Sequence, residues 1–368
     1  MVTTEIKTIK PAGGGDYNSL NDWELAERTN LVTADKIKVA EIYGGGSCLT
    51  PPQFVMASAN WTVDANRYVI IRAASGQAHS GVLNTSKAWM SVGLSGVAAL
   101  HISVGFTRIG PGISMSGSHG CMQFDGMSGN TPVLVEGMIV VPFYEAGIYF
   151  ISCGTGNHVV KNCALYGPCQ YYFVRATSSI CTVYNCTIVN TLNYAGCLWA
   201  NGASSIVVSQ NNYLSTAMTN AAYLASGGGT MTKGDHDATY DGEALTPSLQ
   251  NIPYTNANFL AVTGGSENLH LQPTSTLRMK GTTLADVTND FEGDNRVGLV
   301  FDIGADQESD VPMCWNYTAQ YKNSSKLYKA SGCGSFPKSL RVPNNVNTDT
   351  GKMIDDGMPI DPKRYSIG

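Results

Sequence analysis

Three carboxylates in this chain could do acid–base chemistry: Asp125, Glu136 and Glu145. A glycoside hydrolase places two carboxyl groups about 5 to 10 Å apart across one groove. The positions aligned with these three in neighbouring repeats are apolar or neutral, and no acidic cluster builds up. Isolated carboxylates are mostly exposed. We therefore expect ordinary surface groups here and predict no catalytic residue.

Arg175 and Lys161 raise the possibility of a polysaccharide lyase, which needs a base beside a group that neutralises a uronate. Both lie on strand-like runs that we expect to be neighbours. No carboxylate set that would hold calcium accompanies them, and basic residues commonly protect strand edges. We expect solvated strand residues.

The densest group of acidic and histidine side chains is GDHDATYDG, residues 234–242. Carboxylate and imidazole groups bind metals, and this stretch offers four of them: Asp235, His236, Asp237 and Asp241. Consecutive residues rarely point at one ion, and Asp and Gly favour turns, so we predict a turn. ADVTNDFEGDNR (285–296) lacks the residue order of an EF-hand loop. We predict no metal and no cofactor.

Ten cysteines are diluted over the 368 residues. The spacings from Cys163 to Cys169 and from Cys181 to Cys186 do not fit a zinc knuckle, and no paired histidine follows. Two Asn-Cys pairs, at Cys163 and Cys186, are 23 residues apart and could approach to disulfide distance if they stack. We expect reduced, packed thiols, because Cys usually behaves as a small buried hydrophobe.

The Asn-Cys pairs belong to a repeat. The stretches VLVEGMIVV, HVVKNCALY, CTVYNCTIV and VVSQNNYLS align on Gly137, Asn162, Asn185 and Asn211, in steps of 25, 23 and 26 residues. A period in the twenties indicates a solenoid, and the leucine frame of a leucine-rich repeat is absent. Asn suits a kink because it tolerates the left-handed conformation, and its amide can hydrogen-bond to the next Asn in a stack. The pattern predicts a parallel β-helix.

A second strand-like run follows each copy: GIYFIS (147–152), YYFVRA (171–176), GCLWAN (196–201) and AAYLAS (221–226). Less regular coils are expected at YVIIRAA (68–74) and ALHISVGFTRI (99–109). Side chains alternate between the two sides of a strand, so the aromatic residues divide between core and surface. The outward ones could form a sugar-binding ladder or a subunit interface. The aromatic residues concerned are Tyr149, Phe150, Tyr171, Tyr172, Phe173, Tyr184, Trp199, Tyr213 and Tyr223.

The N-terminal stretch DYNSLNDWELAERTN predicts a capping helix of two to three turns. Ser19 or Asn21 can cap its start, because each is followed three residues later by an acidic residue. Its expected apolar face consists of Leu20, Trp23 and Leu25. Such a helix would cover the open end of the first coil. DKIKVAEIYGGG (35–46) predicts a strand that ends in a turn.

The net charge is −5, and the sequence contains no block of basic residues. We therefore expect no nucleic-acid partner. No run of 18 or more apolar residues predicts a membrane span. The first residues show no apolar core of a secretory signal, so we expect synthesis in a host cytoplasm and no membrane partner.

Three parts of the chain resemble the right-handed parallel β-helix proteins of the pectate-lyase-like superfamily, especially those of bacteria and tailed bacteriophages. These parts are residues 9–43, the Asn-Cys coils, and residues 269–307, where DFEGDNR precedes DIGAD. The resemblance implies an all-β right-handed parallel β-helix in which residues 269–307 close the fold. It leaves function open, because the superfamily includes lyases, hydrolases, tailspikes, decoration proteins and adhesins.

The last residues, 309–368, fall outside that pattern and contain five prolines. They show no convincing strand or helix periodicity but carry large apolar groups: Trp315, Tyr317, Tyr321, Leu327, Tyr328, Phe336 and Tyr365. Because a linker would have few such groups, we predict an extended arm that binds a neighbouring subunit or partner. The expected domains are an N-terminal cap (1–60), the β-helix with its closing segment (61–308) and the C-terminal arm (309–368).

A signal-free β-helix without a visible catalytic cluster favours a structural bacteriophage virion protein, either a decoration protein of the capsid or a spike or fibre component of the tail. The resemblance to phage spikes implies a homotrimer. Expected partners are copies of itself, a capsid or tail protein and a surface polysaccharide. The alternative is a depolymerase of the tailspike type, either lyase or hydrolase. A cell-surface adhesin would need an export signal or anchor.

Overall fold

The computed structural model describes residues 1–51, 53–92, 96–117, 120–192, 196–216, 222–242, 244, 248–296 and 300–308, together with four short strands in the C-terminal part. The chain divides into two compact units, Met1–Gln307 and Glu308–Gly368. The first contains the candidate site.

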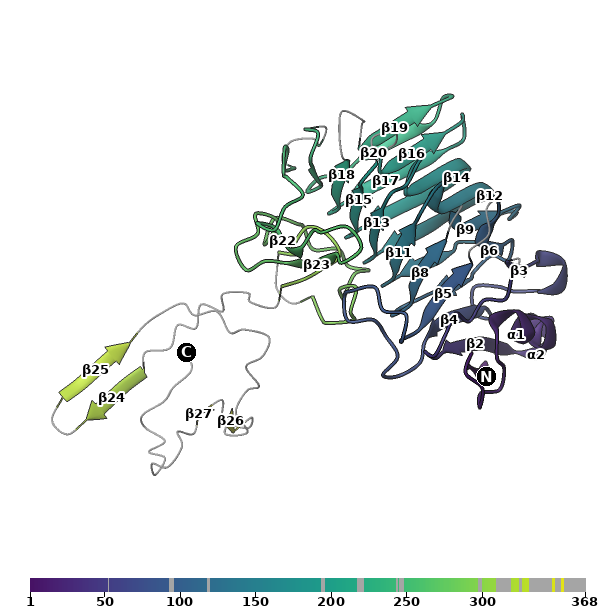
Figure 1. Cartoon of the computed structure of the whole chain (residues 1–368), viewed down its shortest axis with the longest axis horizontal. Coiled ribbons are helices and arrows are strands. Elements are labelled where there is room, and N and C mark those ends of the chain that lie inside the picture. The colour runs from purple at the N-terminus through teal and green to yellow at the C-terminus, as the bar shows by residue number, and fades with distance from the viewer. Residues whose placement is uncertain are drawn as a thin grey trace. The chain divides into compact units, whose positions relative to one another are not determined.

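The first unit is a parallel β-helix, as the repeat predicts: coils stack on one another through parallel ladders (Figure 1). The complete coils contribute strands to three faces. The groove face consists of β3 (Phe54–Met56), β6 (Ala98–Ile102), β9 (Gly120–Asp125), the first halves of β12 (Ala146–Lys161) and β14 (Val174–Tyr184), β16 (Leu198–Asn201) and β19 (Tyr223–Ser226).

The other two faces complete the coil. The covered face consists of β5 (Trp89–Val92), β8 (Ser114–Gly117), β11 (Ile139–Pro142), β13 (Ala164–Gly167), β15 (Thr187–Asn190), β18 (Tyr213–Thr216) and β21 (Ala238–Thr239). The long face consists of β1 (Thr3–Ile9), β2 (Lys36–Ile42), β4 (Val69–Ala73), β7 (Arg108–Ile109), β10 (Leu134–Glu136), the second halves of β12 and β14, β17 (Ile206–Gln210) and β20 (Thr230–Lys233).

The kink positions stack between the long face and the covered face. Gly137, Asn162, Asn185 and Asn211 all have left-handed backbones, with φ between 47° and 58°, which confirms the predicted kinks. The predicted amide ladder is wrong. The buried amides of Asn162 and Asn185 have no hydrogen-bond partner among the described residues. The amide of Asn211 instead bonds to the backbone of Thr282 at 2.6 and 2.9 Å, because a later segment covers this corner.

The eight described cysteines are all buried and free, as expected. Cys163 and Cys186 lie on adjacent coils, and each Sγ donates to a carbonyl of its own coil at 3.1 Å, that of Lys161 and Tyr184 respectively. Burial raises the pKa of the Cys186 thiol well above its usual value. These thiols therefore pack as apolar groups in the interior of the solenoid.

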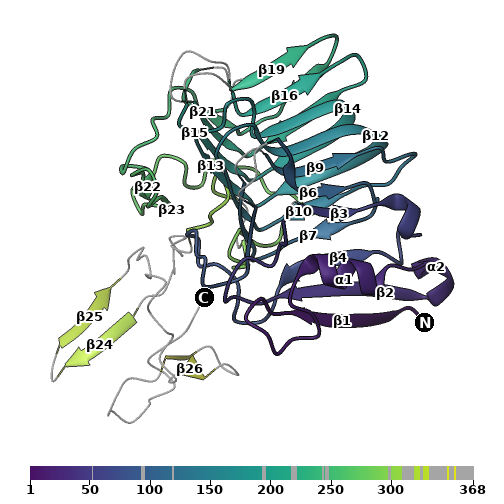
Figure 2. The same ribbon diagram turned by 45° about the vertical axis from the view of Figure 1, so that its right-hand side comes forward.

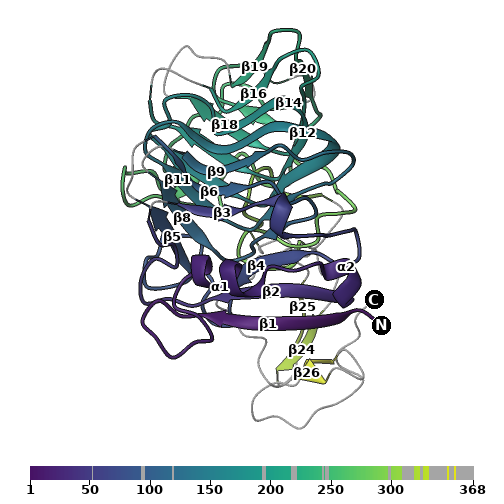
Figure 3. The same cartoon turned by 90° about the vertical axis from the view of Figure 1, so that its right-hand side faces the viewer.

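The N-terminal helix α1 (Leu20–Glu27) is capped by Ser19, whose Oγ accepts from Asp22 N at 3.0 Å. Of the predicted apolar face, Leu20 and Trp23 join the solenoid core, but Leu25 is 61% exposed and that part of the prediction is wrong. The short helices α2 (Leu31–Ala34) and η1 (Ser58–Asn60) follow. Figure 3 shows β1, an unpredicted strand, at the N-terminal edge. No helix of the described chain is long and apolar enough to cross a membrane.

Residues 249–296 and 300–307 lie against the outside of the covered face, where Figure 2 shows the hairpin β22 (Phe259–Ala261) and β23 (Asn268–Leu271). They bury the outward side chains of that face and form a second core. Its members include Ile139, Val141, Ala164, Tyr166, Val189, Tyr213, Phe259, Leu271, Phe291 and Ile303. The predicted closing segment therefore covers one side of the solenoid, and Tyr213 is a core residue.

The second unit contains two antiparallel pairs, β24 (Ala319–Asn323) with β25 (Lys326–Ala330), and β26 (Val346–Asn347) with β27 (Lys352–Met353). The sequence showed no convincing periodicity for these strands, in which Tyr321 and Tyr328 are paired across the first hairpin. The remaining predicted anchors outside these strands lie outside the described residues: Trp315, Tyr317, Phe336 and Tyr365.

Candidate functional site

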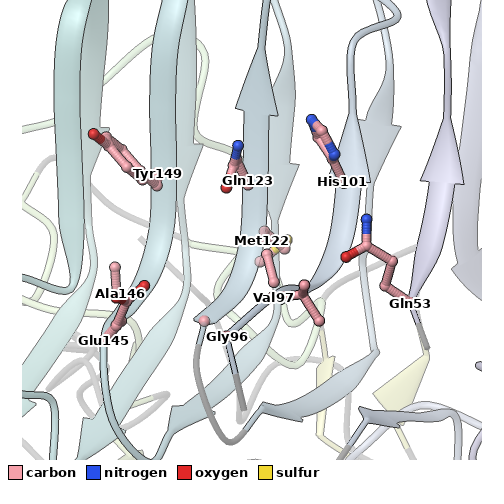
Figure 4. Close-up of a pocket in the computed structure, with 11 residues that line it drawn as sticks. Gln53, Gly96, Val97, His101, Met122, Gln123, Glu145, Ala146 and Tyr149 are labelled. Carbon is pink, nitrogen blue, oxygen red and sulfur yellow. The ribbon is translucent and has the colours of Figure 1, made fainter. Parts of the chain in front are cut away.

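A pocket of about 430 Å³ opens on the groove face, over β3, β6, β9 and the beginning of β12. Figure 4 shows His101, Gln123 and Tyr149 side by side on neighbouring strands, with Glu145 toward the start of β12. The backbone of Gly96, Gly120 and Ala146 forms part of the wall. Several polar side chains therefore converge on one hollow, as in ligand sites.

A hydrogen-bonded group fixes the His101 ring at the edge of this pocket. His101 Nε2 lies 2.9 Å from Asp125 Oδ2, and the same oxygen accepts from Gln123 Nε2 at 2.9 Å. A carboxylate bound to one ring nitrogen sets the ring orientation. The arrangement can hold His101 in place toward a ligand.

Parallel register aligns one outward row of side chains along the groove face. His101 is paired with Gln123, Gln123 with Tyr149, Tyr149 with Arg175 and Arg175 with Trp199. Adjacent strands are about 4.8 Å apart, so the row continues the pocket along the solenoid. Sequence alternation explains why the row points outward, since its flanking residues in β14 and β16 are fully buried.

Arg175 lies between two aromatic rings. Its guanidinium carbon is 4.4 Å from the centroid of the Tyr149 ring and 4.1 Å from that of Trp199. Trp199 also contacts Tyr172 at 5.0 Å between centroids, and its Nε1 donates to Ser226 Oγ at 2.9 Å. The row therefore ends in an ordered aromatic platform, and the outward Tyr149 and Trp199 belong to it.

The three predicted carboxylates do not form a catalytic pair. Glu136 forms an ion pair with Lys161 on the long face, at 3.3 Å. Asp125 on β9 lies opposite Ile151 of β12. Glu145 directly precedes β12 and is six residues before Ile151 in the chain. Six residues of strand span about 20 Å of backbone, well beyond the separation that a glycoside hydrolase uses.

Arg175 and Lys161 also lie apart, although β12 and β14 are neighbouring strands. Arg175 is paired with Tyr149 on the groove face, whereas Lys161 is paired with Tyr184 on the long face. Lys161 Nζ donates to the carbonyl of Asp286 in the closing segment at 2.7 Å. The alternative of a lyase pair formed by these two residues is therefore not supported.

The GDHDATYDG stretch forms the predicted turn, and His236 has a left-handed backbone there. Asp237 is fully buried and accepts from Ser209 Oγ, Tyr223 Oη and Asn212 N at 2.6 to 2.7 Å. Its oxygens are thus used in hydrogen bonds that hold the last coil together. Burial raises the pKa of Asp237 to about 6.

Potential metal ligands approach one another in the closing segment instead. His270, Glu292 and Asp306 have ligand atoms within 4.8 Å of one another, as do Asp290, Glu292 and Asp294. Both ring nitrogens of His270 are already hydrogen-bonded, to Glu292 Oε2 at 2.7 Å and to Asn268 Oδ1. These hydrogen bonds connect parts of the closing segment to one another.

Sequence reasoning missed His101 and Gln123 as site residues. The signal was present in the strand ALHI, because His101 lies between two residues, Leu100 and Ile102, that alternation places in the core. Asp125 follows Gln123 by two residues and therefore shares its side of β9. What the sequence lacked was the register that brings these side chains together.

Comparisons with known proteins identify no relative of this chain. No protein-family model matches the chain, and neither curated proteins nor solved structures give a significant match.

Proposed function

We propose that this chain is a structural β-helix protein that binds a polysaccharide along its groove face. The observation that carries the proposal is the aligned row His101, Gln123, Tyr149, Arg175 and Trp199, which continues from the pocket. Sugar rings present apolar C–H faces and polar edges. An array of aromatic rings and amide, imidazole and guanidinium donors matches both features.

The direction of the row suits a linear polymer. Its members are one coil apart, so successive sugar units of a chain laid along the solenoid axis would meet successive strands. Rigid neighbours already order two of the rings: Arg175 packs against Tyr149, and Ser226 accepts from Trp199. Binding would therefore cost little side-chain entropy.

Binding is favoured over cleavage because of where the acidic groups lie. The carboxylates nearest the pocket, Asp125 and Glu145, are six strand positions apart, and Asp125 is engaged by His101 and Gln123. A depolymerase remains the second candidate, because the same His101–Asp125 pair could serve as an oriented base.

We further propose that the protein is a virion component, a decoration protein of the capsid or a spike of the tail, that assembles as a homotrimer. The solenoid architecture and the sequence resemblance to phage β-helix proteins support this proposal. Light scattering should give three times the 39.1 kDa chain mass, and antibodies should detect the protein in purified virions. A stable monomer that is absent from virions would remove the proposal.

Trp199→Ala and Tyr149→Ala are each expected to weaken polysaccharide binding about tenfold or more. Truncating an anchoring aromatic residue at an interface costs at least about 1 to 2 kcal/mol, and 1.4 kcal/mol is tenfold. Isothermal titration against purified surface polysaccharides measures the change. Tyr184→Ala is the matched control, because Tyr184 is a partly exposed aromatic residue on β14 but on the long face.

The same samples separate binding from cleavage. Reducing ends or unsaturated products that accumulate with the wild type and disappear in His101→Ala would identify the depolymerase. Bound but intact polysaccharide supports the binding role. Equal loss of affinity in Tyr184→Ala and Trp199→Ala would contradict the groove face as the site.

Deleting residues 309–368 is expected to leave a soluble, folded β-helix that no longer assembles. The first unit, Met1–Gln307, has its own continuous core, so its circular dichroism and melting should persist. Size exclusion with light scattering should show a shift from trimer to monomer. An oligomer of unchanged size after the deletion would contradict the assembly role of the C-terminal arm.

A further inference from the structure

We infer that Arg175 is a receptor for the carboxylate of an acidic sugar, so that the polysaccharide bound on the groove face is anionic. This inference rests on the proposed function and names its ligand class. Four observations carry it: the two rings that enclose the guanidinium, its missing anionic partner, its place in the row and the pairing of neighbouring charges.

The two rings fix the plane in which Arg175 can bind. Tyr149 and Trp199 lie on adjacent strands on either side of it, with the guanidinium carbon 4.4 and 4.1 Å from their centroids. With its faces occupied, the group can form hydrogen bonds only at its edge. A guanidinium edge is a planar fork of N–H donors that matches the two oxygens of a carboxylate.

Arg175 lacks the anionic partner that Arg67 and Arg72 have. Its Nε is buried and makes no hydrogen bond to a described residue. By contrast, Arg72 forms an ion pair with Glu41, and Arg67 forms ion pairs with both Asp35 and Asp64. A partly buried cation without an anion is unfavourable unless a ligand supplies one.

The two neighbours of Arg175 in the row, Tyr149 and Trp199, carry no negative charge. Asp125, an acidic residue of the groove face, is bound to His101 and Gln123. Tyr149 Oη is occupied by the Thr177 hydroxyl, which donates to it at 3.5 Å. An incoming carboxylate would therefore find an ordered cation and stacking surfaces for its sugar ring in the same place.

The test compares acidic polysaccharides with their own neutral forms. Polygalacturonate, alginate, hyaluronan and a purified capsular polysaccharide with acidic sugars are titrated beside their carboxyl-reduced forms, and dextran sulfate represents a different anion. We expect at least one native acidic chain to bind about tenfold or more tightly than its reduced form. Arg175→Met should abolish that preference, and Arg175→Lys should restore only part of it because lysine lacks the planar fork.

Arg108→Met is the matched control, because Arg108 also lies over an aromatic ring, at 4.0 Å from the centroid of Tyr68, but on the long face. The Arg108→Met variant should bind the polysaccharides like the wild type. A melting temperature equal to that of the wild type shows that each variant is folded. Equal binding of native and reduced chains, or a preference that persists in Arg175→Met, overturns the inference and leaves glycan binding intact. Tighter binding of dextran sulfate than of every carboxylated chain also overturns it. If no chain binds in either form, the proposed function fails as well.

Discussion

Arg296→Met is expected to release the closing segment from the covered face and to lower the free energy of unfolding by about 3 to 5 kcal/mol. Arg296 is buried, and burial lowers the pKa of its guanidinium. It donates to the carbonyls of Gly304 and Ala305 at 2.8 Å each, and to Gln307 Oε1 and Asn289 O at 3.2 Å. Methionine fills similar space but donates no hydrogen bond, so the carbonyl of Gly304 loses this donor, whereas Ala305 O and Gln307 Oε1 keep those from Phe291 N and Asp302 N.

The loss of stability should extend beyond the contacts of the Arg296 side chain, because Arg296 connects the two sequence fragments DFEGDNR and DIGAD. Once they are joined, Ala305 N donates to Thr187 Oγ1 of the covered face at 3.0 Å, and Gly304 N donates to Asn211 O at 2.8 Å. Gly304 has φ of 102°, and a Cβ there would lie 2.6 Å from Thr187 Oγ1. Docking therefore depends on the local geometry that Arg296 holds.

Urea unfolding followed by tryptophan fluorescence and circular dichroism measures this effect, and limited proteolysis near residue 297 reports local release. Arg67→Met is the control, because Arg67 forms surface ion pairs with Asp35 and Asp64 and its loss should change stability little. Similar stability losses in both variants would contradict a special role for Arg296.

Asp237→Ala is expected to destabilise the last coil by at least about 3 kcal/mol, because it leaves several buried hydrogen-bond donors without an acceptor. Asp237 lies just before β21 and accepts from residues of three other places in the coil: Ser209 Oγ, Tyr223 Oη and Asn212 N. Hydrogen exchange should rise first in β17, β19 and β21. Asp235→Ala, in the exposed turn two residues earlier, is the control.

The contribution of Asp237 should also depend on pH with a defined sign. Burial raises its pKa from 3.8 to about 6, so the folded state holds the proton more tightly than the unfolded state. Its stabilising contribution is therefore complete below pH 4 and is lost as pH rises to about 6. A shift of about two units corresponds to roughly 3 kcal/mol.

Asp237→Asn imitates the protonated acid and removes this dependence. The stability of Asp237→Asn relative to the wild type should rise between pH 4 and 6 and stay level above that. Asp290 also has a pKa raised to about 6, through burial and the nearby Asp306, so only the difference between variant and wild type isolates Asp237. A difference that is constant over this range would contradict the raised pKa.

The sequence by itself determined the architecture of the coil. Alternating apolar residues define strands, and Gly or Asn at a constant step defines the left-handed kinks at Gly137, Asn162, Asn185 and Asn211. These signals are local, because backbone preference and side-chain alternation act within a few residues. The cap at Ser19 and the buried thiols were predictable for the same reason.

Only the tertiary structure decided which outer face stays open. The closing segment covers one face through contacts such as Lys161 with Asp286, 125 residues apart in sequence, and Ala305 with Thr187, 118 residues apart. This covering makes Tyr213 a core residue and leaves Tyr149 and Trp199 on the groove face. The sequence shows which side chains point outward, but the register between distant segments decides which of them meet, since that register depends on the packing of the whole coil.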